Sequence, residues 1–377
     1  MRVLHFYKVA LPDSIGGVET VIHQLSLGSV RLGHQVDVLA MTRGGKPRVI
    51  DFAGYKVHLI PQCFEWASTP LGFSIFSAFK KLALEADIIH YHYPWPLMDL
   101  AHLFLIPKRP SLVSYHSDIV KQSFLKKIYS PVQNMFLREM DFIVASTSNY
   151  FLTSHVLNKF SSKVKIIPYG IEDFFEGSVQ SGHFDSWKAV FPNPFFFFVG
   201  VLRYYKGLKT LVEASKETGL TVVIAGDGPE ASSLRAYAKK IGAAQVFFVG
   251  KISDEDKAVL LNLCLALVFP SDIRSESFGL TLVEGLMFSK PLISCEIGTG
   301  TSFINLANET GFVIPPGDKD ALGKAMQYLY DRPKLAIVLG LNGRERFKSH
   351  FNSGAMVKGY MVLYEQMMRD GNSLKWA

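Results

Sequence analysis

The sequence predicts an α/β protein of two doubly wound, Rossmann-like domains that face each other across a cleft. Short β-rich runs alternate with amphipathic stretches along the whole chain, and the alternation starts afresh near residue 194. A strand followed by a helix, repeated several times, is typical of a parallel sheet with helices on both faces. The length of 377 residues fits two such domains.

The first half of the chain shows this alternation clearly. The apolar residues Val18, Val21, Ile22 and Leu25 recur at helical spacing, which predicts a helix over residues 17–34. The candidate strands around it are residues 2–10, 35–41, 55–61, 86–92, 111–116, 141–147 and 164–170.

The second half repeats the pattern after a polar, glycine-containing linker predicted at residues 172–186. We expect domains over residues 1–175 and 176–352, and a helix over 353–377 that packs back on the first domain. A further helix is predicted at 321–330. The candidate strands are residues 195–200, 220–226, 245–250, 265–270, 290–295 and 311–316.

Composition indicates a globular protein. Hydrophobic residues make up 48% of the chain and charged residues 19%, which excludes disordered, collagenous and coiled-coil classes. The three cysteines, Cys63, Cys264 and Cys295, stand far apart among apolar residues, so we expect buried reduced thiols and no disulfide framework.

Charge and hydropathy limit the partners. The net charge of +7 lies mostly in the first half and favours phosphate groups, but at this size it does not favour nucleic acid. The first residues do not resemble a signal peptide, and no run approaches about 20 apolar residues. We therefore expect a cytoplasmic protein.

Gly16 and Gly17 follow the first predicted strand and open the first helix. Adjacent glycines let the backbone approach a ligand, and a helix N-terminus suits a phosphate or a sugar oxygen. An ordinary strand-to-helix turn explains them equally well. The segment is not the G-x-G-x-x-G fingerprint, which removes the main support for a nicotinamide dehydrogenase.

Three loops of the second half follow predicted strands in the same way. Arg203 and Lys206 lie after the strand at 195–200, where two cations can neutralise a diphosphate or simply be solvated. The turn at residues 225–230 can approach a ligand. Lys251 and Ile252 follow the strand at 245–250, where exposed backbone can hydrogen-bond the edge of a base.

The segment from Pro270 to Gly285 carries the strongest signal. Glu276 is predicted in a loop, with Ser277 as helix cap and Phe278, Gly279 and Leu280 as a first turn whose free N–H groups point into the cleft. Glu284 falls inside the helix among apolar residues. A carboxylate there needs a partner, which ribose hydroxyls or a structural Arg or Lys would provide.

Several features of the first domain point to ligands less specifically. His116 ends a predicted strand beside Ser117 and Asp118, and we expect it to face the cleft. Residues 121–139 are basic and rich in aromatic residues, as in a helix on an anionic membrane surface, or in helices packed on the sheet. Trp66 and Trp95 could stack on an acceptor sugar or lie in the core.

In the second domain, residues 296–301 are predicted to form a flexible, hydroxyl-rich loop.

Taken together and in this order, these segments resemble the retaining glycosyltransferases of family 4, which have the GT-B fold. The resemblance runs from Gly16–Gly17 to about Pro316, and its most specific part is the spacing of Glu276 and Glu284 in SESFGLTLVEG. VGVLRYYKG, AGDGP and GGVE add to it. Within the family, the chain looks most like bacterial mannosyltransferases that use GDP-mannose in O-antigen or other polysaccharide assembly.

The resemblance implies roles for the charged residues. Arg203 and Lys206 would bind the diphosphate and stabilise it as it leaves. Glu276 would hold hydroxyls of the donor sugar, and Glu284 would bind the ribose. His116 would lie near the transferred sugar.

It also implies roles for backbone groups and neighbouring residues. Residues 278–280 would contact the donor sugar and the phosphates through their backbone, and Gly16–Gly17 would approach the phosphates from the first domain. Lys251 and Ile252 would lie near the base.

The expected reaction is transfer of a hexose, mannose in the closest group, with retention of anomeric configuration. The donor is a nucleotide-diphospho-sugar and the acceptor a lipid-linked sugar or an oligosaccharide. We expect no cofactor and no metal, because no Asp-x-Asp stands where it would carry one. Residues 121–139 would hold the enzyme on the inner face of the cytoplasmic membrane.

Other functions stay open at this point. A UDP-sugar-dependent glycosyltransferase would use the same segments with another donor base. A nucleotide-sugar epimerase or a phosphorylase would share the two-domain architecture. A non-catalytic protein that binds nucleotides or a membrane surface would not depend on Glu276.

Overall fold

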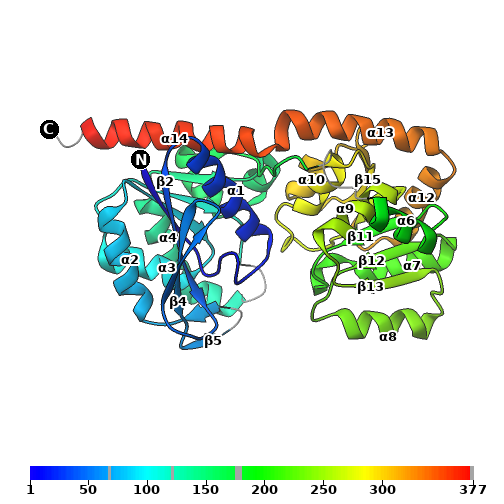
Figure 1. The fold of residues 1–377 in the computed structure, drawn as a ribbon, viewed down its shortest axis with the longest axis horizontal. Helices are drawn as coiled ribbons and strands as arrows, with labels where there is room; N and C mark the ends of the chain where they lie inside the picture. The colour runs from blue at the N-terminus through cyan, green and yellow to red at the C-terminus, as the bar shows by residue number, and fades with distance from the viewer. Residues whose placement is uncertain (67–68, 120–122, 175–180, 374–377) are drawn as a thin grey trace. The chain divides into compact units, whose positions relative to one another are not determined.

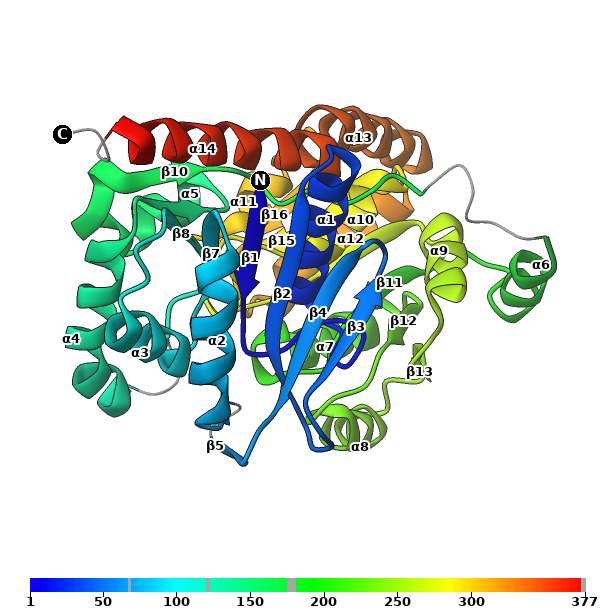
Figure 2. The ribbon, with the colours of Figure 1, turned by 60° about the vertical axis from the view of Figure 1, so that its left-hand side comes forward.

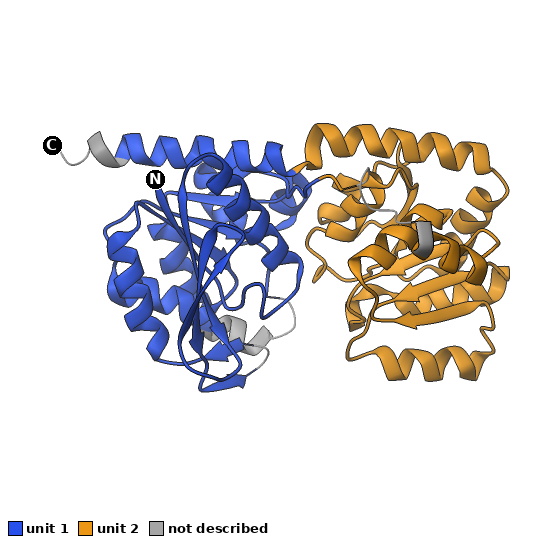
Figure 3. Ribbon diagram, in the orientation of Figure 1, with its two compact units in different colours: residues 1–172, 353–377 blue, residues 173–352 orange. Residues whose placement is uncertain are grey.

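A computed structural model describes residues 1–66, 69–119, 123–174 and 181–373 (Figure 1). The chain divides into two compact units (Figure 3). Unit 1 consists of Met1–Glu172 with Ser353–Ala377, and unit 2 of Asp173–Asn352.

Unit 1 contains an eight-stranded sheet of order β10-β9-β8-β7-β1-β2-β4-β3, in which β3 is antiparallel to β4 and the other neighbours pair in parallel. Its strands are β1 (Arg2–Phe6), β2 (Gln35–Thr42), β3 (Arg48–Phe52), β4 (Tyr55–Pro61), β7 (Ile88–Tyr93), β8 (Ser111–Tyr115), β9 (Phe142–Ala145) and β10 (Val164–Ile166). A separate hairpin pairs β5 (Phe64–Trp66) with β6 (Thr69–Leu71).

Helices cover both faces of this sheet (Figure 2). They are α1 (Gly17–Arg31), α2 (Ser74–Glu85), α3 (Pro96–Leu105), α4 (Ser123–Glu139), α5 (Ser148–Thr153), a 3-10 turn (Leu157–Lys163) and α14 (Ser353–Ser373).

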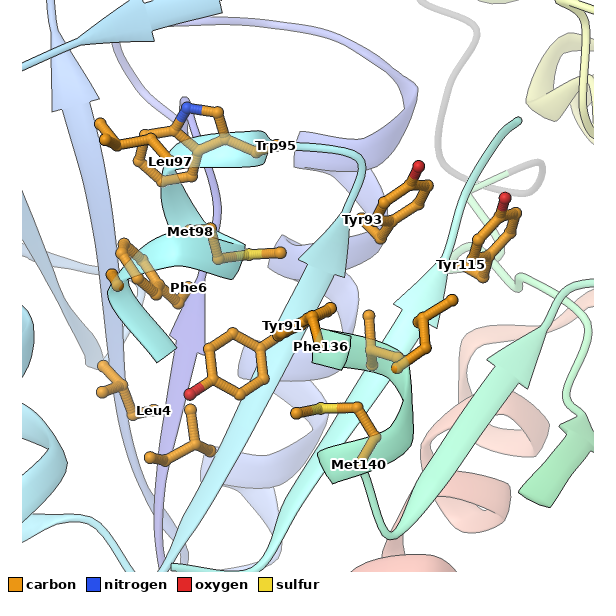
Figure 4. Packing of buried hydrophobic residues seen from close by; sticks show 14 of the residues in the cluster. Leu4, Phe6, Tyr91, Tyr93, Trp95, Leu97, Met98, Tyr115, Phe136 and Met140 are labelled. Atoms are coloured by element: carbon orange, nitrogen blue, oxygen red, sulfur yellow. The ribbon is translucent and has the colours of Figure 1, made fainter. Parts of the chain in front are cut away.

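The main core of unit 1 lies between the sheet and helices α2, α3 and α4. Phe79 of α2 is buried in this core. Met98 of α3 and Phe136 of α4 are buried in it with Tyr91 of β7 (Figure 4). Side chains alternate between the two faces of a strand. The residues on either side of Tyr91 therefore face away from this core, toward α14.

Unit 2 contains a six-stranded sheet of order β13-β12-β11-β14-β15-β16, parallel throughout. Its strands are β11 (Phe196–Val199), β12 (Val222–Ala225), β13 (Val246–Gly250), β14 (Ala266–Phe269), β15 (Leu292–Cys295) and β16 (Gly311–Ile314). The apolar run that forms β11 is fully buried, as expected of a central strand in a parallel sheet.

The helices of unit 2 connect these strands in the order of a doubly wound fold. They are α6 (Ser181–Val190), a 3-10 turn (Tyr204–Lys206), α7 (Leu208–Thr218), α8 (Ala231–Ile241), α9 (Asp254–Leu263), α10 (Leu280–Met287), α11 (Gly300–Ile304), α12 (Lys319–Tyr330), α13 (Pro333–Arg346) and a π-helical turn (Phe347–Phe351).

Some local predictions are wrong. The predicted linker at 172–186 includes the first turns of α6, while residues 175–180 lie outside the described part of the chain. The segment at 296–301 is not a loop throughout, because α11 begins at Gly300. Cys63 is exposed, whereas Cys264 and Cys295 are buried.

Over residues 1–66, 69–119, 123–174 and 181–373, no helix combines the length and the apolar character needed to cross a bilayer.

Candidate active site

Two loops of unit 2 meet where strands β11 and β14 end. The strands are neighbours, so the loops after Val199 and after Phe269 leave the same edge of the sheet. At their contact, Gly207 has φ +63°, and a Cβ built on it would lie 1.9 Å from the carbonyl oxygen of Pro270. Only glycine allows this approach.

The approach brings Lys206 and Glu276 together. Lys206 Nζ lies 2.5 Å from Glu276 Oε2, and the side chains are only 10% and 12% exposed. Ser271 donates a hydrogen bond of 3.3 Å to the same carboxylate oxygen, and Lys206 Nζ lies 4.3 Å from the ring centre of Phe269. The ion pair compensates two charges that would otherwise be costly to bury.

Arg203 does not take part in this buried pair. It is exposed, in extended conformation, immediately before the 3-10 turn that carries Lys206. Its side chain is therefore accessible to an anion from solvent, whereas Lys206 is held in place.

Glu284 has a structural partner. Lys257 Nζ, on α9, lies 2.8 Å from Glu284 Oε1 and 3.0 Å from Asp254. Burial alone would lower the pKa of Lys257, but the two carboxylates outweigh it and raise the pKa. Glu284 was expected to bind either ribose hydroxyls or a structural Arg or Lys. Lys257 is such a structural partner.

The start of α10 differs from its prediction. The helix begins at Leu280, and its N-cap is Gly279, which has φ +98° and makes no side-chain capping bond. Ser277 is therefore not the cap, and Phe278 and Gly279 precede the helix. Phe278 is buried, with its ring 6.2 Å from that of Phe351.

The loops after β12 and β13 lie along the same sheet edge. Leu202 N–H donates to Asp227 O at 2.9 Å, and Gly226 N–H donates to Gly250 O at 2.7 Å. These bonds join the loop that carries Arg203 and Lys206, through the turn after β12, to the loop after β13. There Lys251 is exposed and Ile252 is half-buried.

In unit 1, Gly16 and Gly17 lie at the N-terminus of α1, with Gly16 as the N-cap. Glu19, the last residue of the GGVE segment, had no predicted role, and its side chain lies against this turn. Ser14 donates to Glu19 Oε1 at 2.8 Å, and a Cβ on Gly16 would lie 2.7 Å from Glu19 Oε2. An acid three residues into a helix is the available sequence signal.

His116 is not an isolated histidine. It is 3% exposed, its Nδ1 lies 2.6 Å from the Tyr169 hydroxyl, and its Nε2 lies 2.9 Å from His92 Nδ1. The chain continues from His92 Nε2 to His5 Nδ1 at 3.0 Å. Both ring nitrogens of His116 therefore bind protein groups. That His116 faces the cleft and lies near the transferred sugar stays a prediction.

Nearby histidines raise the question of a metal. Ligand atoms of His5, His90 and His92 lie within 4.8 Å of one another. However, His90 bonds Tyr364 through Nδ1 and Ser114 through Nε2, both at 2.7 Å, and His5 bonds His92. Hydrogen bonds to protein groups occupy five of the six ring nitrogens of these three histidines, and His5 Nε2 is the exception among the described residues.

Of the residues predicted to contact an acceptor or a membrane, some are exposed and others are buried in unit 1. Trp95 is buried and donates to Pro70 O at 3.2 Å, whereas Trp66 is 59% exposed on β5. In α4, Phe136 and Leu137 are buried in the core of unit 1 and Met135 is exposed. Residues 121–122, the start of the predicted surface, lie outside the described residues.

Comparisons with known proteins agree with this architecture. The family model "Glycosyltransferase Family 4" matches residues 15–173, and "Glycosyl transferases group 1" matches residues 183–346. The chain belongs to this family of glycosyltransferases and is such an enzyme. The predicted family, fold class and type of activity are confirmed.

Two curated relatives are similar over nearly their whole length. The chain is 44% identical to the D-rhamnosyltransferase WbpZ of Pseudomonas aeruginosa over 94% of this chain and 93% of the relative. It is also 44% identical to the O-antigen chain mannosyltransferase C of Escherichia coli, over 98% and 99%.

Among solved structures, the sucrose-phosphate synthase of Thermosynechococcus elongatus matches with a TM-score of 0.80 at 21% identity, over 98% of this chain and 99% of that one. At this identity the likeness concerns the fold, which is GT-B.

Proposed function

We propose that this enzyme transfers mannose from GDP-mannose, with retention of anomeric configuration, to a lipid-linked sugar or an oligosaccharide in O-antigen assembly. The likeness to the O-antigen chain mannosyltransferase C supports the pathway and the sugar. The Lys206–Glu276 pair at the ends of β11 and β14 is the observation that carries the chemistry. It places a fixed cation and a fixed carboxylate side by side, where parallel sheets bind their ligands.

In the proposed reaction, the bond between C1 of the sugar and the diphosphate oxygen breaks, and the acceptor hydroxyl oxygen bonds to C1. The hydroxyl proton passes to the departing diphosphate. Lys206 and Arg203 would stabilise the negative charge that grows on this diphosphate, which is the main electrostatic demand of the step. Glu276 would orient the donor sugar by accepting its hydroxyl protons.

Other groups would position the nucleotide. Glu284, held by Lys257 at 2.8 Å, would accept hydrogen bonds from the ribose with its remaining acceptor capacity. The backbone of residues 278–280 would contact sugar and phosphates, and Lys251 and Ile252 would lie beside the base. We propose no metal or other cofactor, because cations of the protein would stabilise the leaving group.

A second donor is supported by the equal identity to WbpZ. D-rhamnose is 6-deoxy-mannose, so the two donors differ by one hydroxyl. A site that hydrogen-bonds this hydroxyl would reject the deoxy sugar strongly, whereas an apolar site would discriminate only weakly.

Thermal shifts test the donor. A ligand at 100 times its Kd stabilises a folded protein by about 2.7 kcal/mol. We expect GDP-mannose and GDP to raise the Tm by several degrees, and UDP-glucose to leave it unchanged. GDP release with a synthetic alkyl mannoside as acceptor, in the presence of EDTA, then tests transfer without a metal. Preference for UDP-glucose, or loss of turnover in EDTA, would contradict the proposal.

A further inference from the structure

A row of polar side chains crosses the middle of unit 1 on the face of the sheet that α14 covers. His5 of β1 pairs in register with His90 of β7, and His92 pairs with Ser114 of β8. His116 follows Ser114 by two residues. Because the side-chain period of a strand is two, all five side chains point to the same face.

The face is closed to solvent. His5, His90 and His92 are 0% exposed, and His116 is 3% exposed. Burial lowers the pKa of all four histidines, to about 3 for His5 and His116. The rings are therefore neutral at physiological pH, and each carries a single N–H.

Because these rings are neutral, the position of the proton on one ring fixes its position on the ring that is hydrogen-bonded to it. A neutral imidazole donates through one nitrogen and accepts through the other. In the chain Tyr169–His116–His92–His5, each imidazole–imidazole bond joins Nε2 of one ring to Nδ1 of the next. All three histidines must then carry the proton on the same kind of nitrogen, either Nδ1 throughout or Nε2 throughout.

His5, the last histidine of this hydrogen-bonded series, distinguishes the two proton arrangements. His5 Nε2 is buried and has no hydrogen-bond partner among the described residues. With protons on Nε2, this atom would be a buried donor without an acceptor. With protons on Nδ1, every N–H has an acceptor and the last donor is His116, toward the Tyr169 oxygen. In this arrangement the atom left without a partner is an acceptor, His5 Nε2, and no N–H of the three rings is unpaired.

We propose that His92 and His5 are positioning residues for His116, and that they hold its proton on Nδ1 through two successive imidazole–imidazole bonds. The inference rests on the proposed function only in that His116 would lie near the transferred sugar. The chain would fix both the orientation of the His116 ring and the identity of its donor atom, in the way that outer partners orient metal-binding histidines.

A second set of bonds ties the same face to the C-terminal helix. Tyr364 of α14 bonds His90 Nδ1, and Tyr360 bonds Ser114 Oγ, each at 2.7 Å. The rings of His90 and His92 stack at 4.3 Å. His90 thus shares the burial, strand and face of His92 but bonds different partners, which makes it a matched control.

Nitrogen-15 NMR of histidine-labelled protein tests the tautomer directly and requires no substrate. We expect the wild-type signals of His5, His92 and His116 to show Nδ1–H. His92→Phe should shift His116 to Nε2–H or to a mixture. His92→Asn, whose amide N–H can replace Nδ1–H, and His90→Phe should leave His116 unchanged. An Nε2–H or charged His116 in the wild type would overturn the proposal even if His92→Phe failed to fold.

Kinetics separate positioning from a structural role. In the GDP-release assay, His92→Phe should lower kcat about ten-fold or more with little change in KM for GDP-mannose, and His92→Asn should restore most of the rate. Equal kcat in His92→Phe and the wild type would refute the positioning role. A wild type that releases no GDP from any donor, with Nδ1–H tautomers intact, would instead contradict the proposed function.

Discussion

Lys206 and Glu276 neutralise each other on two loops that meet at a glycine. This arrangement keeps a cation and a carboxylate in place without a ligand. In the proposed mechanism a donor diphosphate would share Lys206 with Glu276, so we expect the two residues to respond to substitution as a unit.

Glu276→Gln removes the carboxylate charge but keeps the size of the side chain. We expect kcat for GDP release to fall about 10²–10³-fold, the typical loss when one electrostatic group of an active site is removed. Binding of GDP should persist, because Lys206 stays available to the diphosphate. Kinetics and thermal shift with GDP measure both effects. Glu309→Gln, an exposed glutamate of unit 2, is the control, and equal activity of the two variants would contradict the assignment.

Gly207→Ala and Gly219→Ala form a matched pair. Both glycines have a left-handed backbone conformation, with φ +63° and +71°. A Cβ added to Gly219 would meet no atom within 4 Å, whereas a Cβ added to Gly207 would lie 1.9 Å from Pro270 O. Gly219→Ala should cost about 1–2 kcal/mol for its conformation. Gly207→Ala should cost about 1–3 kcal/mol more for the steric overlap. Urea unfolding measures the difference, and equal losses would contradict this account.

At the scale of elements, α6 docks on α9 through one carboxylate. Asp256 Oδ1 accepts from Trp187 Nε1 at 2.7 Å and lies 3.0 Å from His183 Nδ1. These two bonds lower the pKa of Asp256 to about 2. A helix that the sequence analysis assigned in part to a linker is thus attached to the unit by side-chain bonds.

Asp256→Asn should loosen α6 and destabilise unit 2 by about 1 kcal/mol or less, because the group is partly solvated. Since the folded pKa is depressed, the contribution of Asp256 is complete above about pH 4 and declines as the pH falls toward 2. Trp187 fluorescence during acid titration reports the docking. A titration midpoint that Asp256→Asn does not change would exclude this contact as its cause.

At the scale of the whole molecule, the two units differ in their histidines. Nine of the eleven histidines belong to unit 1, and the other two, His183 and His350, are exposed in unit 2. The buried histidines of unit 1 have lowered pKa values because of burial. Unfolding lets them bind protons that the folded unit excludes.

Unit 1 should therefore lose stability on mild acidification before unit 2 does. The loss begins below about pH 6.5 and grows by up to about 1.4 kcal/mol per pH unit for each buried histidine. Hydrogen exchange resolved by peptide, between pH 7.5 and 5, measures protection in each unit separately. Earlier loss of protection in unit 2 would contradict the prediction.

Most of the architecture could be predicted because each parallel strand is a short apolar run and each helix has an apolar face. The antiparallel strand β3 was missed, since exposed residues alternate irregularly along it. The start of α10 was misplaced because Gly279 occupies a left-handed cap that replaces the expected Ser277 cap. A local pattern does not contain the backbone conformation that determines such a boundary.

The sequence by itself determined the family, the two α/β units and the order of the segments that carry charge, because these depend on periodicity and on motifs of adjacent residues. Tertiary structure alone decided which of those residues meet. Lys206 and Glu276 stand 70 residues apart, and His5 and His92 stand 87 apart. Neighbouring strands and the loops that follow them bring such residues together. Because buried polar groups cannot bind water, each of them then needs a hydrogen-bond partner within the protein.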